Sequence, residues 1–333
     1  MKGKADRWVV IGCNSFSGAH CVNDLLQAGN EVAGISRSPK PHGAFLPYTW
    51  SAERGDFIFL QSDLNTQLPD ISNFLREWCP DYVINFAAQG MVAQSWQFPH
   101  HWYQTNIVSM VQLHEILKDQ NQLRRYVHIS TPEVYGHCEG AVKEEQRFNP
   151  STPYAVSRAA CDFSLMAYHR TYNFPVVFTR AANVFGPGQQ LYRIIPRTIL
   201  AVRTGRKLQL HGGGYSERSF IHITDVIRAT VDLAIRGTSG KAYHLATPTQ
   251  VTIRRLVQMI CEIMGADFGD IVNETGDRMG KDQSYSLDCS RIESELGWRP
   301  KQSLEGGLKE VIEWVDLHLE DLVKEPFDYK HKP

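Results

Sequence analysis

The first half of the chain alternates short apolar runs with longer amphipathic segments, and this rhythm constrains the fold more than any other feature. The apolar runs are nearly continuous, which is typical of parallel strands covered on both faces. The expected strands cover residues 7–12, 31–36, 57–63, 81–88, 125–131 and 175–180. Helical patterns lie between them at residues 19–28, 71–79, 102–119 and 154–172. This alternation predicts an α/β fold built on a doubly wound parallel sheet.

The regular alternation ends near residue 183, where glycine-rich turns begin to interrupt the chain. Short strands are expected at residues 219–223 and 242–246, and helices at 225–235, 252–264 and 304–322. We therefore expect a Rossmann-type dinucleotide-binding domain over residues 1–182, with returning segments near 219–246. Residues 183–333 are expected to form a smaller C-terminal α/β domain that mainly binds the substrate.

Composition excludes several classes of protein. The chain has 333 residues, with 35 basic and 36 acidic side chains and a formal net charge of -1, so a concentrated positive face for nucleic acid or a membrane surface is not expected. It lacks an apolar run of the roughly 18 residues that a membrane span needs. Its polar start does not resemble a signal peptide. Seven scattered cysteines without a Cys-x-x-Cys pair indicate neither a disulfide framework nor a zinc site. We expect a reduced, cytoplasmic protein without a bound metal.

A glycine turn stands where the first strand gives way to the first helix. Gly12 fits the tight bend and Gly18 the close packing of helix on strand, so that the helix N-terminus would face a pyrophosphate. An ordinary strand–helix turn can also contain two glycines, so the turn alone does not establish that a dinucleotide binds here. The residues expected to bind a dinucleotide here are Gly12, Asn14, Ser15, Phe16, Ser17 and Gly18.

The end of the second strand bears on which dinucleotide binds. NAD sites usually place Asp or Glu here to accept from the ribose 2′-hydroxyl, whereas this chain has Ser36 and Arg37. A hydroxyl and a permanent cation suit a 2′-phosphate. We therefore expect NADP as the cofactor, with NAD as the alternative if Arg37 is only a solvated side chain.

Candidate catalytic residues follow the fifth strand and open the helix after it. Thr131 and Glu133 lie just beyond a strand end, and ligands in open α/β sheets bind outside the carboxyl ends of the strands. Tyr154 and Arg158 are one helical turn apart and so lie on one face. The alternatives are a strand-end cap for the first pair and an exposed helical pair for the second.

With these motifs the sequence strongly resembles the extended short-chain dehydrogenase/reductase family, specifically its nucleotide-sugar epimerases and 4,6-dehydratases. The run Ser130–Gly136 resembles the dehydratases more than the simple epimerases, and Ala87-Ala88-Gln89 is similar to the GDP-mannose 4,6-dehydratases. The other segments that carry the resemblance are Gly12–Gly18, Asp63-Leu64, Asn85–Gln89, the Tyr154 helix, Arg180–Pro187, Gly212–Arg218, Asp225, Asp277–Asp282 and Glu295–Pro300.

The resemblance implies a role for each matching residue. Tyr154, as phenolate, takes the proton of the sugar 4-hydroxyl while hydride leaves C4, and Thr131 hydrogen-bonds the same oxygen. Glu133 removes the C5 proton as water leaves C6, and hydride returning to C6 gives a 4-keto-6-deoxy sugar. The further cofactor-binding residues are Asp63, Leu64, Ala87, Ala88, Gln89, Asn106, Tyr154 and Arg158. The implied substrate-binding residues are Gln89, Thr131, Glu133, Asn183, Arg218 and Asp282.

The sequence departs from the family pattern at two catalytic positions. Arg158 replaces the usual Lys four residues after the Tyr; it keeps the positive charge, but its planar fork differs from a compact ammonium. A tyrosine hydroxyl has a pKa of about 10, so this cation has to lower it. Pro132 stands where dTDP-glucose dehydratases carry Asp, and proline has no proton to give. Either Glu133 returns the proton that it took, or another group or water supplies the proton. Ser15 in place of the family's middle glycine is a milder change.

The sequence therefore predicts an NADP-dependent nucleotide-sugar 4,6-dehydratase. One alternative is a 4-epimerase or a decarboxylase that uses the same 4-keto intermediate, and Glu133 distinguishes them because simple 4-epimerisation needs no base at C5. An alternative of another class is a catalytically idle nucleotide-sugar-binding protein, which Arg158 and Pro132 would favour. The family resemblance also implies a homodimer, formed through the helices at residues 102–119 and 154–172.

Overall fold

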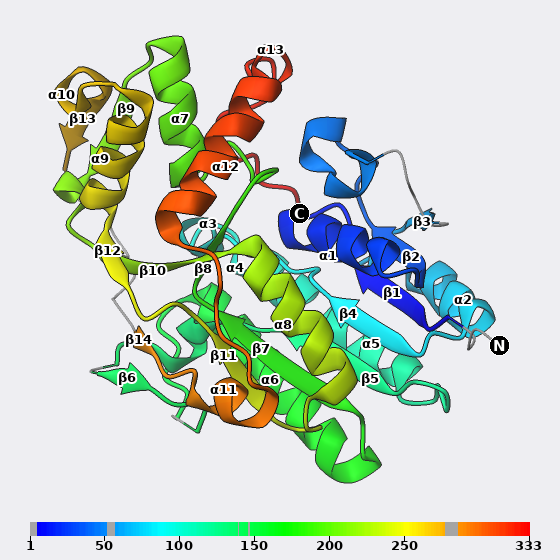
Figure 1. Ribbon diagram of the computed structural model, residues 1–333. Helices are drawn as coiled ribbons and strands as arrows, with labels where there is room; N and C mark the ends of the chain where they lie inside the picture. The colour runs from blue at the N-terminus through cyan, green and yellow to red at the C-terminus, as the bar shows by residue number, and fades with distance from the viewer. Residues whose placement is uncertain (1–4, 52–56, 139, 146, 277–285) are drawn as a thin grey trace.

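The computed structural model describes residues 5–51, 57–138, 140–145, 147–276 and 286–333. A seven-stranded sheet in the order β11-β7-β5-β4-β1-β2-β3 forms its centre (Figure 1), and all neighbouring strands are parallel. The strands are β1 (Arg7–Ile11), β2 (Glu31–Ser36), β3 (Phe57–Gln61), β4 (Tyr82–Asn85), β5 (Arg125–Ile129), β7 (Val176–Ala181) and β11 (Ala242–Leu245). The predicted α/β class and doubly wound sheet are confirmed. The strand order reverses between β1 and β4, where such sheets bind their ligands.

Helices cover both faces of the sheet, which explains why its strands are apolar throughout. One face packs against α1 (Phe16–Gln27) and α8 (Ile223–Arg236). The other packs against α2 (Leu68–Trp78), α5 (Ser109–Leu117) and α6 (Pro153–Tyr172). Each layer has its own apolar core, so the sheet is buried from both sides.

The helix predicted over residues 102–119 is divided in the structure. It consists of α4 (Pro99–Tyr103), a π-helical turn over Gln104–Val108 and α5. A π turn inserts one extra residue into the helical ladder and is often found at functional sites. Here it turns the buried side chain of Asn106 toward the end of β4, where its amide oxygen accepts a hydrogen bond from the Gln89 N–H at 2.8 Å.

The later part of the chain builds smaller layers around a third apolar core. A three-stranded sheet contains β12 (Gln250–Thr252), β10 (Glu217–His222) and β8 (Asn183–Phe185), and a parallel pair contains β9 (Leu208–His211) and β13 (Val272–Thr275). Its helices are α7 (Ile194–Thr204), α9 (Ile253–Met264), α12 (Leu304–Leu317) and α13 (Leu319–Leu322). The helix predicted over residues 304–322 is therefore interrupted at His318. β11 returns to the edge of the large sheet.

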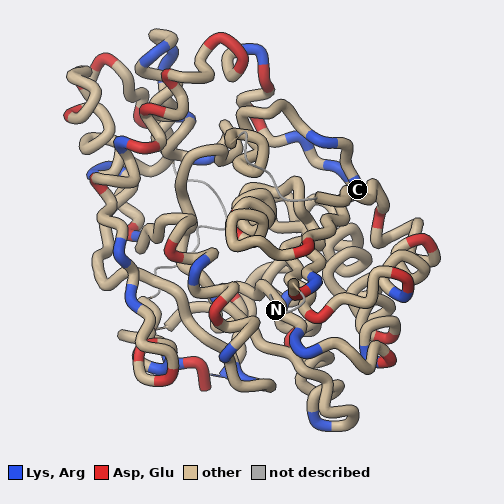
Figure 2. The backbone as a smooth tube through the Cα atoms, turned by 45° about the vertical axis from the view of Figure 1, so that its right-hand side comes forward, with Lys and Arg blue, Asp and Glu red and all other residues tan. Residues whose placement is uncertain are grey.

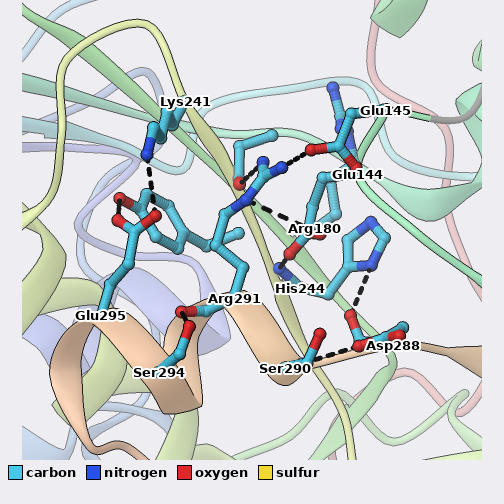
Figure 3. Close-up of polar contacts among 12 residues, drawn as sticks. Glu144, Glu145, Arg180, Lys241, His244, Asp288, Ser290, Arg291, Ser294 and Glu295 are labelled. Atoms are coloured by element: carbon cyan, nitrogen blue, oxygen red, sulfur yellow. Dashed lines mark hydrogen bonds and ion pairs between the residues drawn. The ribbon is translucent and has the colours of Figure 1, made fainter.

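A group of ion pairs covers the outer edge of the sheet beside β11 (Figure 3). Arg291 of α11 (Ser290–Leu296) pairs with Glu145 and lies 3.9 Å from the buried carboxylate of Glu144. One turn later, Glu295 of the same helix binds Lys241 at 2.8 Å. A bare parallel edge would expose unpaired backbone groups, and these contacts hold α11 over it.

Charged residues of both signs are interspersed along the chain in Figure 2, in keeping with the balanced composition. None of the helices in the described part of the chain is long and apolar enough to cross a membrane.

The turn between β1 and α1 depends on two glycines. Gly12 has a φ of 80° and donates its N–H to the Ile35 carbonyl at 2.7 Å. A Cβ at Gly12 would lie 2.7 Å from the backbone nitrogen of Ala87, and a Cβ at Gly18 would overlap the Gly12 carbonyl oxygen. Ser15 caps the helix by accepting from the Gly18 N–H at 3.1 Å. The turn thus brings the α1 N-terminus, β1 and the end of β4 together without side chains between them.

We predict that Gly12→Ala will be far more destabilising than Gly29→Ala, although both glycines have a φ of 80°. Gly29 has no neighbouring atom within 4 Å of an added Cβ, so its substitution costs only the left-handed conformation, about 1–2 kcal/mol. Gly12→Ala adds the clash with Ala87, worth about 1–3 kcal/mol more. Urea unfolding of the two variants measures the difference, and equal losses would show that close approach does not constrain this turn.

Candidate active site

A cavity of about 220 Å³ opens at the carboxyl ends of β1, β2 and β4, on the point where the strand order reverses. It is lined by most of the residues that the sequence analysis assigns to the cofactor. They are Gly12, Asn14, Ser15, Ser36, Arg37, Asp63, Leu64, Ala87, Ala88 and Gln89. Ser38, Asn65 and Thr105 also line it and were not selected from the sequence. Asn65 lies two residues beyond Asp63, so its strand-end position was an available signal.

Four predicted cofactor residues lie behind the cavity wall. Phe16, Ser17 and Gly18 form the first turn of α1, and the Phe16 ring is packed into the core under the sheet. Asn106 is fully buried; its side-chain N–H donates to the Gln89 carbonyl at 3.0 Å and to the Ser157 hydroxyl at 2.9 Å. It therefore ties the cavity wall at Gln89 to α6, the helix that carries Tyr154.

The rim of the cavity at the end of β2 is cationic. Arg37 follows β2 directly, without an acidic residue beside it in the sequence Ser36-Arg37-Ser38. In the structure its guanidinium donates to the main-chain oxygens of Lys332, at 3.2 Å, and Pro333. Asp63, which follows the neighbouring strand β3, turns its carboxylate back to accept from the Asn65 N–H at 2.8 Å.

Thr131, Glu133 and Tyr154 meet at the carboxyl end of β5. Thr131 caps a 3₁₀ turn over Pro132–Tyr135, accepting from the Glu133 N–H at 3.3 Å, and its hydroxyl is also hydrogen-bonded to Tyr154. This hydrogen bond lowers the pKa of Tyr154, as expected when the Thr131 hydroxyl donates to the phenol oxygen. Tyr154 itself is fixed in the first turn of α6, after the N-cap Thr152. Pro132 begins the 3₁₀ turn, a position at which proline sets a favourable φ.

Arg158 points from α6 into the interior, under the site. It is 2% exposed; its guanidinium donates to the Ile129 carbonyl and to Nε2 of His128 at 3.1 Å. Burial and the nearby Arg158 charge hold the pKa of His128 well below its usual value, so the ring is neutral and accepts this hydrogen bond. Nε and one terminal nitrogen of Arg158 have no partner among the residues that the structure describes.

Opposing effects set the pKa of Tyr154. Burial is the largest and raises the pKa, and the nearby Glu133 charge raises it too. The Arg158 charge, the Thr131 hydrogen bond and the charge of Arg193 lower it, but the net pKa remains above its ordinary value. Arg158 thus acts in the expected direction and is outweighed by desolvation. Arg193, at the N-cap of α7, is a neighbour that the sequence analysis missed, because no motif marks it.

The buried side chains of His114, His128 and Cys161 could hold a metal ion by distance, since their ligand atoms all lie within 4.8 Å of one another. The Arg158 guanidinium, however, is bound to one of these rings. A fixed cation at that distance opposes a divalent ion. We therefore treat the cluster as part of the polar support beneath the site.

Two predicted substrate residues lie on the smaller sheet. Asn183 of β8 is opposite Phe220 of β10, and Arg218 is two residues before Phe220, so the side chains of Asn183 and Arg218 share one face. Asn183 donates to the Ser219 carbonyl at 3.3 Å, and Arg218 to the Glu217 carbonyl at 2.8 Å. Asp282 lies outside the described residues.

Comparisons with known proteins show the family to which the chain belongs. The chain matches the GDP-mannose 4,6 dehydratase family over residues 9–311. It is 32% identical over 279 residues to the dTDP-glucose 4,6-dehydratase of Haemophilus influenzae, covering 78% of this chain and 82% of that one. Identity to the same enzyme of Streptomyces antibioticus is 30% over 317 residues, covering 92% and 91% of the two chains. The solved structure of DesIV, a dTDP-glucose 4,6-dehydratase from Streptomyces venezuelae with NAD and TYD bound, matches with a TM-score of 0.86 at 31% identity and covers 94% of this chain and 98% of that chain.

Proposed function

Since this chain belongs to the GDP-mannose 4,6-dehydratase family of nucleotide-sugar enzymes, as the sequence resemblance predicted, we propose that it converts a dTDP- or GDP-linked hexose into a 4-keto-6-deoxy sugar nucleotide, with NADP as its hydride carrier. The observation that carries the proposal is the grouping of Thr131, Glu133 and Tyr154 at the end of β5. This grouping lies next to the cavity, because Asn106 is bonded both to Gln89 in its wall and to Ser157 on the Tyr154 helix.

The cavity fits a nicotinamide dinucleotide. The close approach at Gly12, where a Cβ would strike Ala87, leaves backbone and a helix N-terminus facing the space in which a pyrophosphate would lie. Gly12, Asn14 and Ser15 would hold that group, and Ser36 with Arg37 the adenosine end. A dinucleotide held by these residues would supply the hydride acceptor for C4 of the sugar and the hydride donor for C6.

The choice of NADP rests on the end of β2. Arg37 offers a guanidinium fork to a 2′-phosphate, and no carboxylate follows β2 to repel one. The alternative is NAD, which is the dinucleotide in the DesIV structure. NAD has no 2′-phosphate, so it would offer the Arg37 charge no anionic partner at the adenosine ribose.

Tyr154 and Glu133 carry out separate proton transfers in the proposed reaction. Tyr154 as phenolate accepts the proton of the sugar 4-hydroxyl, and Thr131 donates to the same phenol oxygen. The 4-keto group then acidifies the C5 proton, which the Glu133 carboxylate removes. Because Pro132 cannot supply a proton, Glu133 also protonates the C6 hydroxyl, which leaves as water. One carboxyl thus takes and gives the same proton, and the elimination is balanced.

The smaller sheet would hold the rest of the substrate. Arg218 carries a positive charge and Asn183 an amide on the same face, which suits the diphosphate of a sugar nucleotide. We propose Asp282 as a further neighbour of the nucleotide. With residues 1–182 as the cofactor domain and 183–333 mainly as the substrate domain, the reacting sugar would lie between Gln89 and these strands.

Glu133→Gln tests the assignment. We predict that it will lower formation of 6-deoxy product by about 10²–10⁴-fold, because the amide cannot remove the C5 proton. The assay offers dTDP-, GDP- and UDP-hexoses and follows keto-sugar and reduced-nicotinamide absorbance. The matched control Glu145→Gln changes an exposed carboxylate that pairs with Arg291. Product formation that survives Glu133→Gln would reject the dehydratase; a C4 epimer would favour the epimerase, and binding without turnover the idle protein.

Arg158→Met should move the pH dependence of activity. Arg158 lowers the pKa of Tyr154, so its removal raises that pKa further and leaves less phenolate at any given pH. The acidic limb of the kcat/KM profile should therefore shift to higher pH, whereas Arg158→Lys, which keeps the charge, should shift it much less. If the acidic limbs of the kcat/KM profiles coincide for the parent protein, Arg158→Met and Arg158→Lys, then Arg158 does not lower the pKa of the Tyr154 phenol.

We also propose that the chain forms a homodimer through α4–α5 and α6. These helices carry exposed apolar side chains at Tyr103, Val108, Val156 and Phe163, with exposures of 38%, 46%, 39% and 60%. Helix faces of this kind pair readily with a second copy in a four-helix arrangement.

Phe163→Glu should convert the dimer to a monomer, because it would place a charge in the apolar interface. Light scattering after size-exclusion chromatography measures the mass of each species. Leu317→Glu is the control, since Leu317 is 78% exposed but lies on α12, away from these helices. A monomeric parent protein, or a dimer that survives Phe163→Glu, would reject this interface.

A further inference from the structure

The last residues of the described chain cross from the smaller layers to the dinucleotide cavity. Figure 1 shows the chain leaving α13 and ending near α1 and β2. On the way, Asp328 pairs with Arg197 at 3.0 Å, and the Tyr329 ring packs on Tyr192 with 5.4 Å between centroids. We call residues 330–333 the tail segment.

His331 fixes the tail segment beside the cavity. Its Nε2 hydrogen-bonds to Nδ1 of His101 at 2.7 Å. Its ring stacks on Trp102 and Phe98, with centroid separations of 5.1 Å and 5.3 Å. Trp102 is fully buried, so the tail segment rests on a rigid part of the fold rather than on loose surface groups.

Beyond this anchor, one carbonyl bridges the cavity. The Lys332 oxygen accepts from Nε2 of Gln89 at 2.7 Å and from the Arg37 guanidinium at 3.2 Å, and the Pro333 oxygen accepts from Arg37 as well. Gln89 follows β4 and Arg37 follows β2, so these donors stand on opposite sides of the β1 turn. The tail segment therefore lies across the crevice that the proposed dinucleotide would enter.

We propose that the tail segment competes with the dinucleotide and sets the preference between NADP and NAD. Both terminal nitrogens of Arg37 donate to the tail oxygens, so a 2′-phosphate would compete with the tail segment for this pair of donors. Either dinucleotide has to displace the Lys332 oxygen from Gln89 and Arg37, but NADP also has to displace the Pro333 oxygen from Arg37, whereas NAD can leave that last contact in place. The inference rests on the proposed dinucleotide site and adds a specificity determinant to it.

The change in dinucleotide affinity depends on the fraction of molecules in which the tail segment has left the cavity. A ligand that binds only the open form has its apparent affinity reduced by the open fraction. If the tail segment has released Arg37 completely in about one tenth of the molecules, removal of the tail should tighten NADP binding about tenfold. The gain for NADP should exceed the gain for NAD, because only NADP uses the donors that Arg37 now gives to the tail.

The test compares the full chain with a chain that ends at Tyr329, which keeps the ring contact with Tyr192. Both proteins are stripped of bound cofactor and titrated with NAD and with NADP by calorimetry. We expect tighter binding to the shortened chain, with the larger change for NADP. His331→Ala, which removes the anchor without shortening the chain, should move both affinities in the same direction. Lys330→Ala should leave them unchanged, since this exposed side chain makes no hydrogen bond or ion pair among the described residues.

The outcomes separate the two proposals. Unchanged or weaker dinucleotide binding to the shortened chain would overturn the competing tail and leave the proposed function intact. An equal gain for NAD and NADP would overturn the specificity role of Arg37. Failure of both proteins to bind either dinucleotide, with the fold intact by circular dichroism, would reject the proposed function itself.

Discussion

The approach of the β1 turn to the end of β4 is the constraint on which the site depends. Gly12 and Ala87 are so close that no Cβ fits between them, and the crevice floor is therefore backbone. This contact lies where the strand order reverses, so the loops after β1, β2 and β4 open toward one space. Every polar group assigned to the cofactor is positioned relative to this floor.

In the buried region behind Tyr154, the positive charge of the arginine side chains is not fully balanced by carboxylates. Asp162 accepts from Arg180 at 2.8 Å and from Ser130 at 2.7 Å, which leaves Arg158 with a neutral histidine and a carbonyl as partners. A buried cation without a carboxylate is costly and favours negative charge close by. The Tyr154 oxygen, once deprotonated, supplies it. Arg158 thus lowers the pKa of Tyr154, although burial keeps that pKa above its ordinary value.

The parts of this structure that follow from local pattern could be predicted. Continuous apolar strands and the glycine turn place the sheet and its crevice, and the spacing of Tyr154 and Arg158 places both on α6. The orientation of the Arg158 side chain could not be predicted from the sequence, because it depends on hydrogen bonds to His128 and Ile129 of β5. The π turn at Asn106 could not be predicted either, because the apolar periodicity of this segment indicates a regular α-helix. Arg193 and the tail reach the site only through tertiary packing, and no signal in their own segments marks them.

The Lys332 oxygen that bridges Gln89 and Arg37 affects how readily such an enzyme would exchange its dinucleotide with the cellular pool. A dehydratase of this kind ends each cycle with its carrier in the oxidation state in which it began, so exchange with the cellular nicotinamide pool is not needed for turnover. A dinucleotide that has displaced the tail segment could therefore stay bound through many cycles. The tail segment would then act on the loading of the enzyme with its carrier and not on the rate of each cycle.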